Sequence, residues 1–370
     1  MLYLILCIFW VILHIINKWY RFFGVVIISV SYSDETKKDS SILLTEGTVE
    51  SDRKGYITAF RSIVVLYTCL AILAVDFTVF PRKYAKTYLT GYSLMDIGVG
   101  LYIVTSGLVG GMKHSSVQSF FQRELSLIIL GFGRFYFVKW SGYVVNQLEY
   151  GTHWNFFFTL ALVLAGGYVI VFFASSRFIL LGAAVGIATY YQGMLSMGLS
   201  EYIRENPGND WFDLNVAGMF SSIGFLSLYL ASAYLGRLLN DRKVKGLFMR
   251  LLLLTAGSGC GFYLLNTYVQ PASRRMCNAA FILLVFFITL IILSVSYAVN
   301  VFYGSAHVPM ILHSFNDHQL AMFLLANVLT GAVNMCIKTM LVDSTISLVI
   351  LFVYMMILCL SACLIDQIKK

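Results

Sequence analysis

The sequence predicts an all-α fold, a polytopic transmembrane helix bundle with roughly eleven to thirteen spans. Hydrophobic residues make up 59% of the 370 residues, only 12% are charged, and the mean hydropathy is +0.80. Soluble domains carry about 25% charged residues. A chain with half that share cannot cover its surface with polar groups, so its surroundings must be largely lipid.

Apolar runs of span length follow one another from residue 58 onward, with short polar segments between them. A helix that crosses a membrane needs about 20 residues. Spans are expected at 58–76, 93–111, 124–142, 155–174, 177–195, 215–236, 247–268, 277–298, 319–340 and 344–364, and 299–316 is a further candidate. No proline falls in the middle of the first ten of these runs, which supports this division because proline breaks helix interiors.

The N-terminal region is organised differently. The apolar character of residues 1–31 predicts one long or two short membrane segments. Residues 32–56 are expected to form a polar loop, followed by a multi-span domain at 57–370. A cleaved signal peptide is disfavoured, because no basic region precedes Leu2 and no clear small-residue cleavage site follows.

Basic residues in the short loops predict the orientation of the spans. The 237–250 loop is rich in lysine and arginine, which places it in the cytosol. Alternation of the spans then puts 32–56, 112–123 and 175–177 on the same side and 77–92, 143–154 and 196–214 on the opposite side. Loop 77–92 breaks the rule, since it carries Arg82, Lys83 and Lys86 where few cations are expected. A basic cluster that violates the topology bias has a stronger claim to function than one that obeys it.

The stretch 74–100 gathers most of the ionisable residues that could carry chemistry. Asp76 ends an apolar run, Pro81 favours a helix end nearby, and Lys86 can fold back toward Asp76. Asp96 begins the next span at the same end. One interpretation is a general base with cations that hold an anionic substrate. The other is an interfacial salt-bridge cluster that fixes helix ends.

A second polar group, His153, Trp154 and Asn155, precedes the apolar run at 155–174. A histidine at a membrane boundary can act as a base or a hydrogen-bond donor. The alternative is an interfacial histidine beside a tryptophan of the aromatic belt.

A third group comprises His307, His313, Asp317 and His318. Its spacing matches no helical zinc pair. Solvated histidines in a loop are therefore the expected reading.

Other functional classes are disfavoured by what the sequence lacks. The seven cysteines form no CxxC pair, and neither GxSxG nor a phosphate-binding glycine loop occurs. The net charge of +8 comes from basic residues in short loops, which argues against nucleic-acid binding. No metal and no cofactor are expected.

Several blocks of the chain resemble the GPI-inositol acyltransferase (PIG-W) family. They are AVDFTVFPRKYAKT followed by GYSLMDIGVG, then EYGTHWNFFFTL, FLLANVLTGAVNMCIKT and, more weakly, NVAGMFSSIGFLSLYL. The resemblance covers most of 57–340 in order. The chain departs from the family pattern at Tyr88, at Val145 and Asn146, and at Ala217, which replace acidic residues or a Glu-His pair.

The resemblance implies a specific function. The family moves a long acyl chain, usually palmitoyl, from acyl-CoA to the inositol ring of glucosaminyl-phosphatidylinositol, in the endoplasmic reticulum membrane during GPI-anchor biosynthesis. The expected partners are therefore acyl-CoA as co-substrate, this glycolipid and the bilayer. The family's essential aspartate and lysine map onto Asp76 and Lys86.

These assignments lead to a hypothesis for the site. Asp76 would take the proton of the inositol hydroxyl, and Lys86 would stabilise the oxyanion or orient Asp76. Arg82 and Lys83 would hold phosphates, and the expected substrate-binding set is completed by Asp96, His153, Trp154 and Asn155. His153 is the alternative base. A transporter or a non-catalytic lipid-binding protein is the alternative class.

Overall fold

The computed structural model describes residues 48–88, 90–113, 115–141, 149–205, 208, 210–241, 244–302 and 308–369. The predicted membrane segments at 1–31, most of the polar loop at 32–56, and Val145, Asn146 and His307 lie outside the described residues. From Gly55 onward the chain belongs to one compact unit, Gly55–Lys370.

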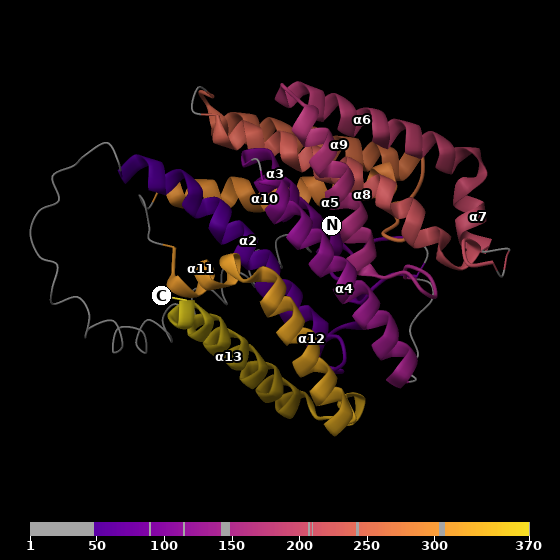
Figure 1. Ribbon diagram of the computed structural model, residues 1–370, viewed down its shortest axis with the longest axis vertical. Helices are drawn as coiled ribbons and strands as arrows, with labels where there is room; N and C mark the ends of the chain where they lie inside the picture. The colour runs from indigo at the N-terminus through magenta and orange to yellow at the C-terminus, as the bar shows by residue number, and fades with distance from the viewer. Residues whose placement is uncertain are drawn as a thin grey trace, which may run out of the picture. The chain divides into compact units, whose positions relative to one another are not determined.

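The described part of the chain consists of long helices joined by short connections, with no strand among them (Figure 1). The long helices are α2 (Thr48–Ala74), α3 (Ile97–Met112), α4 (Val117–Ser141), α5 (Phe156–Phe173), α6 (Arg177–Met194), α8 (Val216–Asn240), α9 (Leu247–Tyr268), α10 (Ala279–Phe302), α12 (Gln319–Cys336) and α13 (Ser344–Lys369). The short ones are η2 (Arg82–Tyr84), η3 (Leu195–Leu199), α7 (Ser200–Glu205), η4 (Asp213–Asn215), α11 (Met310–Asp317) and η5 (Thr339–Leu341).

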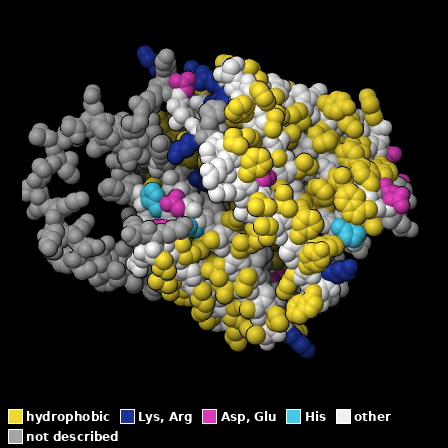
Figure 2. Space-filling model, viewed as in Figure 1, with side chains coloured by type: hydrophobic (Ala, Val, Ile, Leu, Met, Phe, Trp, Pro, Cys, Tyr) yellow, Lys and Arg dark blue, Asp and Glu magenta, His cyan; other side chains and the backbone are white. Residues whose placement is uncertain are grey.

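Eight of the described helices are long and apolar enough to cross a membrane. They comprise the Gly55–Ala74 part of α2, then α5, α6 with its continuation to Glu205, α8 with η4, α9, α10, α12 and α13. Figure 2 shows hydrophobic side chains spread over the viewed face, with few charged groups among them. The all-α, polytopic fold is confirmed.

Two of the predicted segments differ clearly from the structure, and one matches it at both ends. Helix α2 begins at Thr48, inside the segment expected to be a polar loop. The candidate span at 299–316 is wrong, since α10 continues to Phe302 and α11 has only eight residues. Helix α9 has the predicted bounds, because its apolar run is flanked by Gly246 and by the polar segment before Pro271.

The connections gather at two ends of the bundle. At one end, the amide of Gly91 donates to the carbonyl of Ala272 at 2.7 Å and that of Thr152 to Leu214 at 3.0 Å. The other end is joined by an ion pair between Arg177 and Asp241 at 2.8 Å. The Thr152–Leu214 bond, together with a hydrogen bond from Lys86 to Glu149, agrees with the predicted grouping of 77–92, 143–154 and 196–214 on one side.

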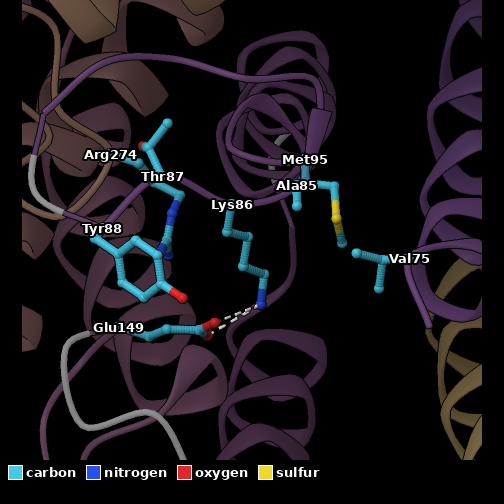
Figure 3. Close-up of a pocket in the computed structure, with 8 residues that line it drawn as sticks. All are labelled: Val75, Ala85, Lys86, Thr87, Tyr88, Met95, Glu149 and Arg274. Carbon is cyan, nitrogen blue, oxygen red and sulfur yellow. Dashed lines mark hydrogen bonds and ion pairs between the residues drawn. The ribbon is translucent and has the colours of Figure 1, made fainter. Parts of the chain in front are cut away.

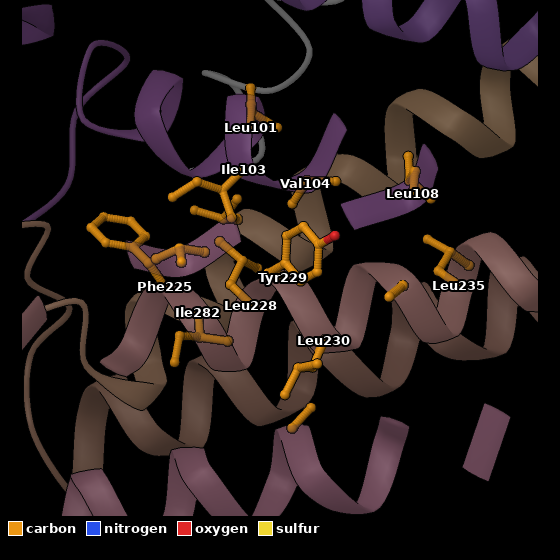
Figure 4. Close-up of a cluster of buried hydrophobic side chains, with 14 of the residues drawn as sticks. Leu101, Ile103, Val104, Leu108, Phe225, Leu228, Tyr229, Leu230, Leu235 and Ile282 are labelled. Atoms are coloured by element: carbon orange, nitrogen blue, oxygen red, sulfur yellow. The ribbon is translucent and has the colours of Figure 1, made fainter. Parts of the chain in front are cut away.

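The core of the bundle lies where α8 packs against α3, α5, α6 and α10. Buried leucine, isoleucine, valine and aromatic side chains of α3 and α8 interlock there (Figure 4). Gly107 and Gly111 of α3, four residues apart, face α8. A Cβ atom on Gly107 would lie 2.6 Å from the carbonyl oxygen of Tyr229, and one on Gly111 would meet the carbonyl oxygen of Ala233. Small residues at this spacing allow two backbones to approach closely in a membrane.

We expect Gly111→Ala to destabilise the protein by about 1–3 kcal/mol, because the added methyl group must push two helix backbones apart. Gly182→Ala in α6 is the matched control, since a Cβ there meets nothing within 4 Å. Alanine favours an open helix position by up to about 1 kcal/mol. Denaturation in detergent would measure both, and equal stability of the two variants would contradict the close α3–α8 contact.

Candidate functional site

Residues 75–96, between α2 and α3, form a loop that is organised around Asp96. The Asp96 carboxylate accepts hydrogen bonds from the amide of Thr87 at 3.2 Å, its hydroxyl at 2.8 Å, and the amide of Ser93 at 2.9 Å. These bonds fold the loop back on itself and fix the backbone next to Lys86.

Asp96 also forms a buried ion pair with Arg274, which lies between α9 and α10. Their side chains are 0% and 4% exposed, and the Nε–Oδ1 distance is 2.9 Å. The Arg274 guanidinium also lies over the ring of Tyr150. A charge removed from water needs such a partner. In this structure Asp96 positions the loop and is not accessible to a substrate, in contrast to its expected binding role.

We expect Arg274→Gln to cost about 3–5 kcal/mol, because it leaves the Asp96 carboxylate buried without its counter-ion. Arg275 provides a matched control. It is 5% exposed and donates to the carbonyl of Ile203, but its Nε and Nη1 have no partner among the described residues. Arg275→Gln should therefore cost less. A larger loss for Arg275→Gln in a denaturation experiment would contradict this account.

A cavity of about 240 Å³ opens beside this loop (Figure 3). It is lined by Val75, Ala85, Lys86, Thr87, Tyr88, Met95, Glu149 and Arg274. The Lys86 ammonium donates to both carboxylate oxygens of Glu149, at 2.8 and 3.0 Å. Burial tends to raise the pKa of Glu149, but the nearby positive charges of Lys86, Arg274 and Arg134 outweigh it and lower that pKa. The cavity therefore holds an ionised carboxylate between cations.

Asp76 lies next to this cavity, since the adjacent Val75 lines it. Its carboxylate accepts a hydrogen bond at 2.8 Å from the side-chain amide of Asn334 in α12. Burial raises the pKa of Asp76, although Asn334, Arg82 and Lys86 act in the opposite direction. Lys86 lies close enough to Asp76 to lower its pKa, as the predicted fold-back requires, but its ammonium donates its hydrogen bonds to Glu149 and not to Asp76.

The two other cations of the loop point in different directions. Arg82 donates to the carbonyl of Val75 at 2.8 Å and contacts the sulfur of Met340. Lys83 is exposed, with its ammonium 5.1 Å from the centre of the Tyr84 ring. Lys83 is thus the more accessible of the two to an anionic group.

Residues 150–155 are held mainly by contacts within the protein. Gly151 has a φ of 122°, and a Cβ there would meet the backbone of Leu214 and Asn215. The Asn215 side-chain oxygen accepts from the amides of His153 and Trp154, at 2.9 and 2.8 Å. Asn155 caps α5 by accepting from Phe157 and Phe158.

These contacts give Asn155 a structural role in place of the expected substrate-binding one. They do not occupy the imidazole ring of His153. The Asn155 amide nitrogen donates to Gly131 at 2.9 Å, so both ends of this buried side chain are used and its place is structural. The Trp154 indole donates to Thr159 at 2.8 Å. His153 Nδ1, by contrast, has no hydrogen-bond partner among the described residues.

The third histidine group lies at the opposite end of the bundle. His313 and Asp317 are exposed, as expected. His318 is only 9% exposed and pairs with Asp366 of α13 at 3.2 Å. The prediction of a solvated His318 is therefore wrong.

The fold and these contacts define a multi-pass membrane protein with a charged, partly buried site at one end of its helix bundle. The GWT1 family model matches residues 1–365, so the chain belongs to the GWT1 family. A phosphatidylinositol-glycan biosynthesis class W protein of Dictyostelium discoideum is 32% identical over 86% of this chain and 75% of its own. GPI-anchored wall transfer protein 1 of Candida glabrata is 33% identical, over 82% and 73%. The protein of the same name in Schizosaccharomyces pombe is 32% identical over 83% of this chain and 71% of its own.

Proposed function

We propose that this protein is an acyltransferase of GPI-anchor biosynthesis in the endoplasmic reticulum membrane. It transfers a long acyl group, such as palmitoyl, from acyl-CoA to the inositol ring of glucosaminyl-phosphatidylinositol. Membership of the GWT1 family and the biosynthetic names of its relatives support the pathway. The observation that carries the chemistry is a charged cavity beside a half-buried carboxylate, at the end of a lipid-embedded bundle.

The reaction needs a base and an electropositive site. Asp76 removes the proton from an inositol hydroxyl, and the oxygen attacks the thioester carbonyl carbon. The negative charge that develops on the carbonyl oxygen is stabilised by Lys86. Collapse of this intermediate breaks the carbon–sulfur bond, and coenzyme A leaves as a thiolate that takes up a proton.

The surrounding residues support these two groups. Glu149 holds the Lys86 ammonium, while Asp96 and Arg274 fix the loop on which Lys86 lies. Asn334 orients the Asp76 carboxylate. Lys83 and Arg82 are suited to the phosphates of either substrate, because both are cationic and lie at the same end of the bundle.

The test is acyl transfer by the purified protein in lipid nanodiscs, with labelled palmitoyl-CoA and glucosaminyl-phosphatidylinositol. We expect acylated glycolipid and free coenzyme A in equal amounts, and both only when the glycolipid is present. Movement of intact palmitoyl-CoA across the membrane without thioester cleavage would instead indicate a carrier. Binding of either lipid without transfer or transport would indicate a non-catalytic lipid-binding protein.

A further inference from the structure

A long apolar groove of about 750 Å³ lies between α4 and α5, apart from the charged cavity. Leu125, Ile128, Phe132 and Phe135 form its wall on α4. Their spacing of three, four and three residues places them on one face of the helix. Ala161 and Ala165, one turn apart on α5, lie on the other side, where small side chains leave the groove its depth.

One end of this groove lies next to the candidate site. His153 lines the groove, and Glu149, four residues earlier, lines the charged cavity. On α4, Phe135 lines the groove while its neighbour Arg134 is close enough to influence Glu149. The segment 149–153 therefore separates the two spaces, and the unpartnered Nδ1 of His153 lies at their junction.

The shape and chemistry of the groove select the kind of ligand. Its lining on α4 runs from Phe120 to Phe135, which is about 22 Å of helix at 1.5 Å per residue. Among the described lining residues, Glu124 and His153 are the ones that can carry a charge. Such a space suits an extended alkyl chain and offers little to a sugar, a phosphate or a nucleotide.

We propose that this groove binds the acyl chain of the donor thioester and determines which chain lengths are transferred. The thioester carbonyl then lies at the end near His153 and the charged cavity, and the methyl end points along α4 toward Glu124. Bulk membrane lipid is the competing occupant. The proposal rests on the proposed function, because that function brings a long acyl chain to this site.

The first test fills the groove and measures the chain-length profile. Ala165→Phe should lower kcat/KM for palmitoyl-CoA by about ten-fold or more, since the added ring occupies the space that the far part of the chain would fill. Transfer from octanoyl-CoA should stay within two-fold of wild type. Ala161 lies about 6 Å nearer the His153 end of the groove. Ala161→Phe should therefore lower the upper limit of accepted chain length further than Ala165→Phe does.

Two further variants separate this effect from misfolding. Leu125 is 59% exposed, so Leu125→Trp narrows the opposite wall with little risk to the core and should shift the profile in the same direction. Ala321→Phe, at an exposed position of α12, should leave the profile unchanged. An unchanged profile for the groove variants, or an equal loss with all donors in folded protein, would overturn the proposal.

A binding measurement keeps the groove assignment independent of turnover. Palmitoyl-CoA with a diazirine in the middle of its chain should label α4 and α5 of the wild-type protein, and unlabelled palmitoyl-CoA should suppress the labelling. Uniform labelling of the lipid-facing helices would indicate bulk lipid and overturn the groove assignment. If wild type labels here but transfers no acyl group, the proposed function fails while the groove assignment stands.

Discussion

Asp76→Asn is expected to reduce the rate of acyl transfer by about 10²–10⁴-fold, the usual contribution of a general base. The amide that replaces the carboxylate has almost the same shape but cannot accept the inositol proton. The half-buried position of Asp76 and its hydrogen bond from Asn334 hold the group in place before substrate binds. The measurement is product formation at saturating palmitoyl-CoA, with equal amounts of folded protein.

Asp343→Asn is the matched control for this change. Asp343 also lies at the site end of the bundle and accepts from the amide of Thr345 at 2.9 Å, at the start of α13. Asparagine is an equally good helix cap, so stability should be kept. Asp343→Asn should keep the wild-type rate. Full transfer by folded Asp76→Asn would place the base elsewhere, and His153 would be the next candidate.

Lys86→Ala is expected to lower kcat by about 10²–10³-fold, because the developing oxyanion loses its electropositive partner. The same change leaves the Glu149 carboxylate in the cavity without its bonded cation, which makes the site more negative. A purely structural ion pair would behave differently, since a partly exposed pair contributes only about 0–1 kcal/mol to stability. Parallel rate and denaturation measurements distinguish the two.

Two variants sharpen the test on Lys86. Lys338→Ala removes an exposed cation from the α12–α13 turn at the same end and should leave kcat unchanged. Lys86→Arg keeps the charge and should recover part of the activity. If Lys86→Ala retained kcat but lost stability, Lys86 would be a positioning residue only.

Much of the fold could be predicted because membrane spans are local features of the sequence. The bounds of α9 follow from one apolar run, and Asp76 is conspicuous as a carboxylate at the end of another. The prediction of a span at 299–316 was wrong because polar residues interrupt this apolar run. Its residues are divided between the end of α10 and the short α11.

The partners in the site were not predictable in the same way. The paired residues lie far apart in the sequence. The separation is 63 residues for Lys86 and Glu149, 178 residues for Asp96 and Arg274, and 258 residues for Asp76 and Asn334. Spacing along one helix therefore carries no information about these contacts. A weak signal existed at Arg274 and Arg275, since two adjacent arginines between apolar runs are costly to bury without partners.

The most direct test of Asp76 as the base is the pH dependence of kcat/KM in wild type and in Asn334→Ala. Asp76 must be ionised to act, so the rate should rise with pH through its pKa, which burial places above that of an exposed aspartate. Removing the Asn334 hydrogen bond, which lowers this pKa, should move the acid limb of the profile to higher pH. An acid limb that stays in place when Asn334 is removed would contradict the assignment of Asp76 as the base.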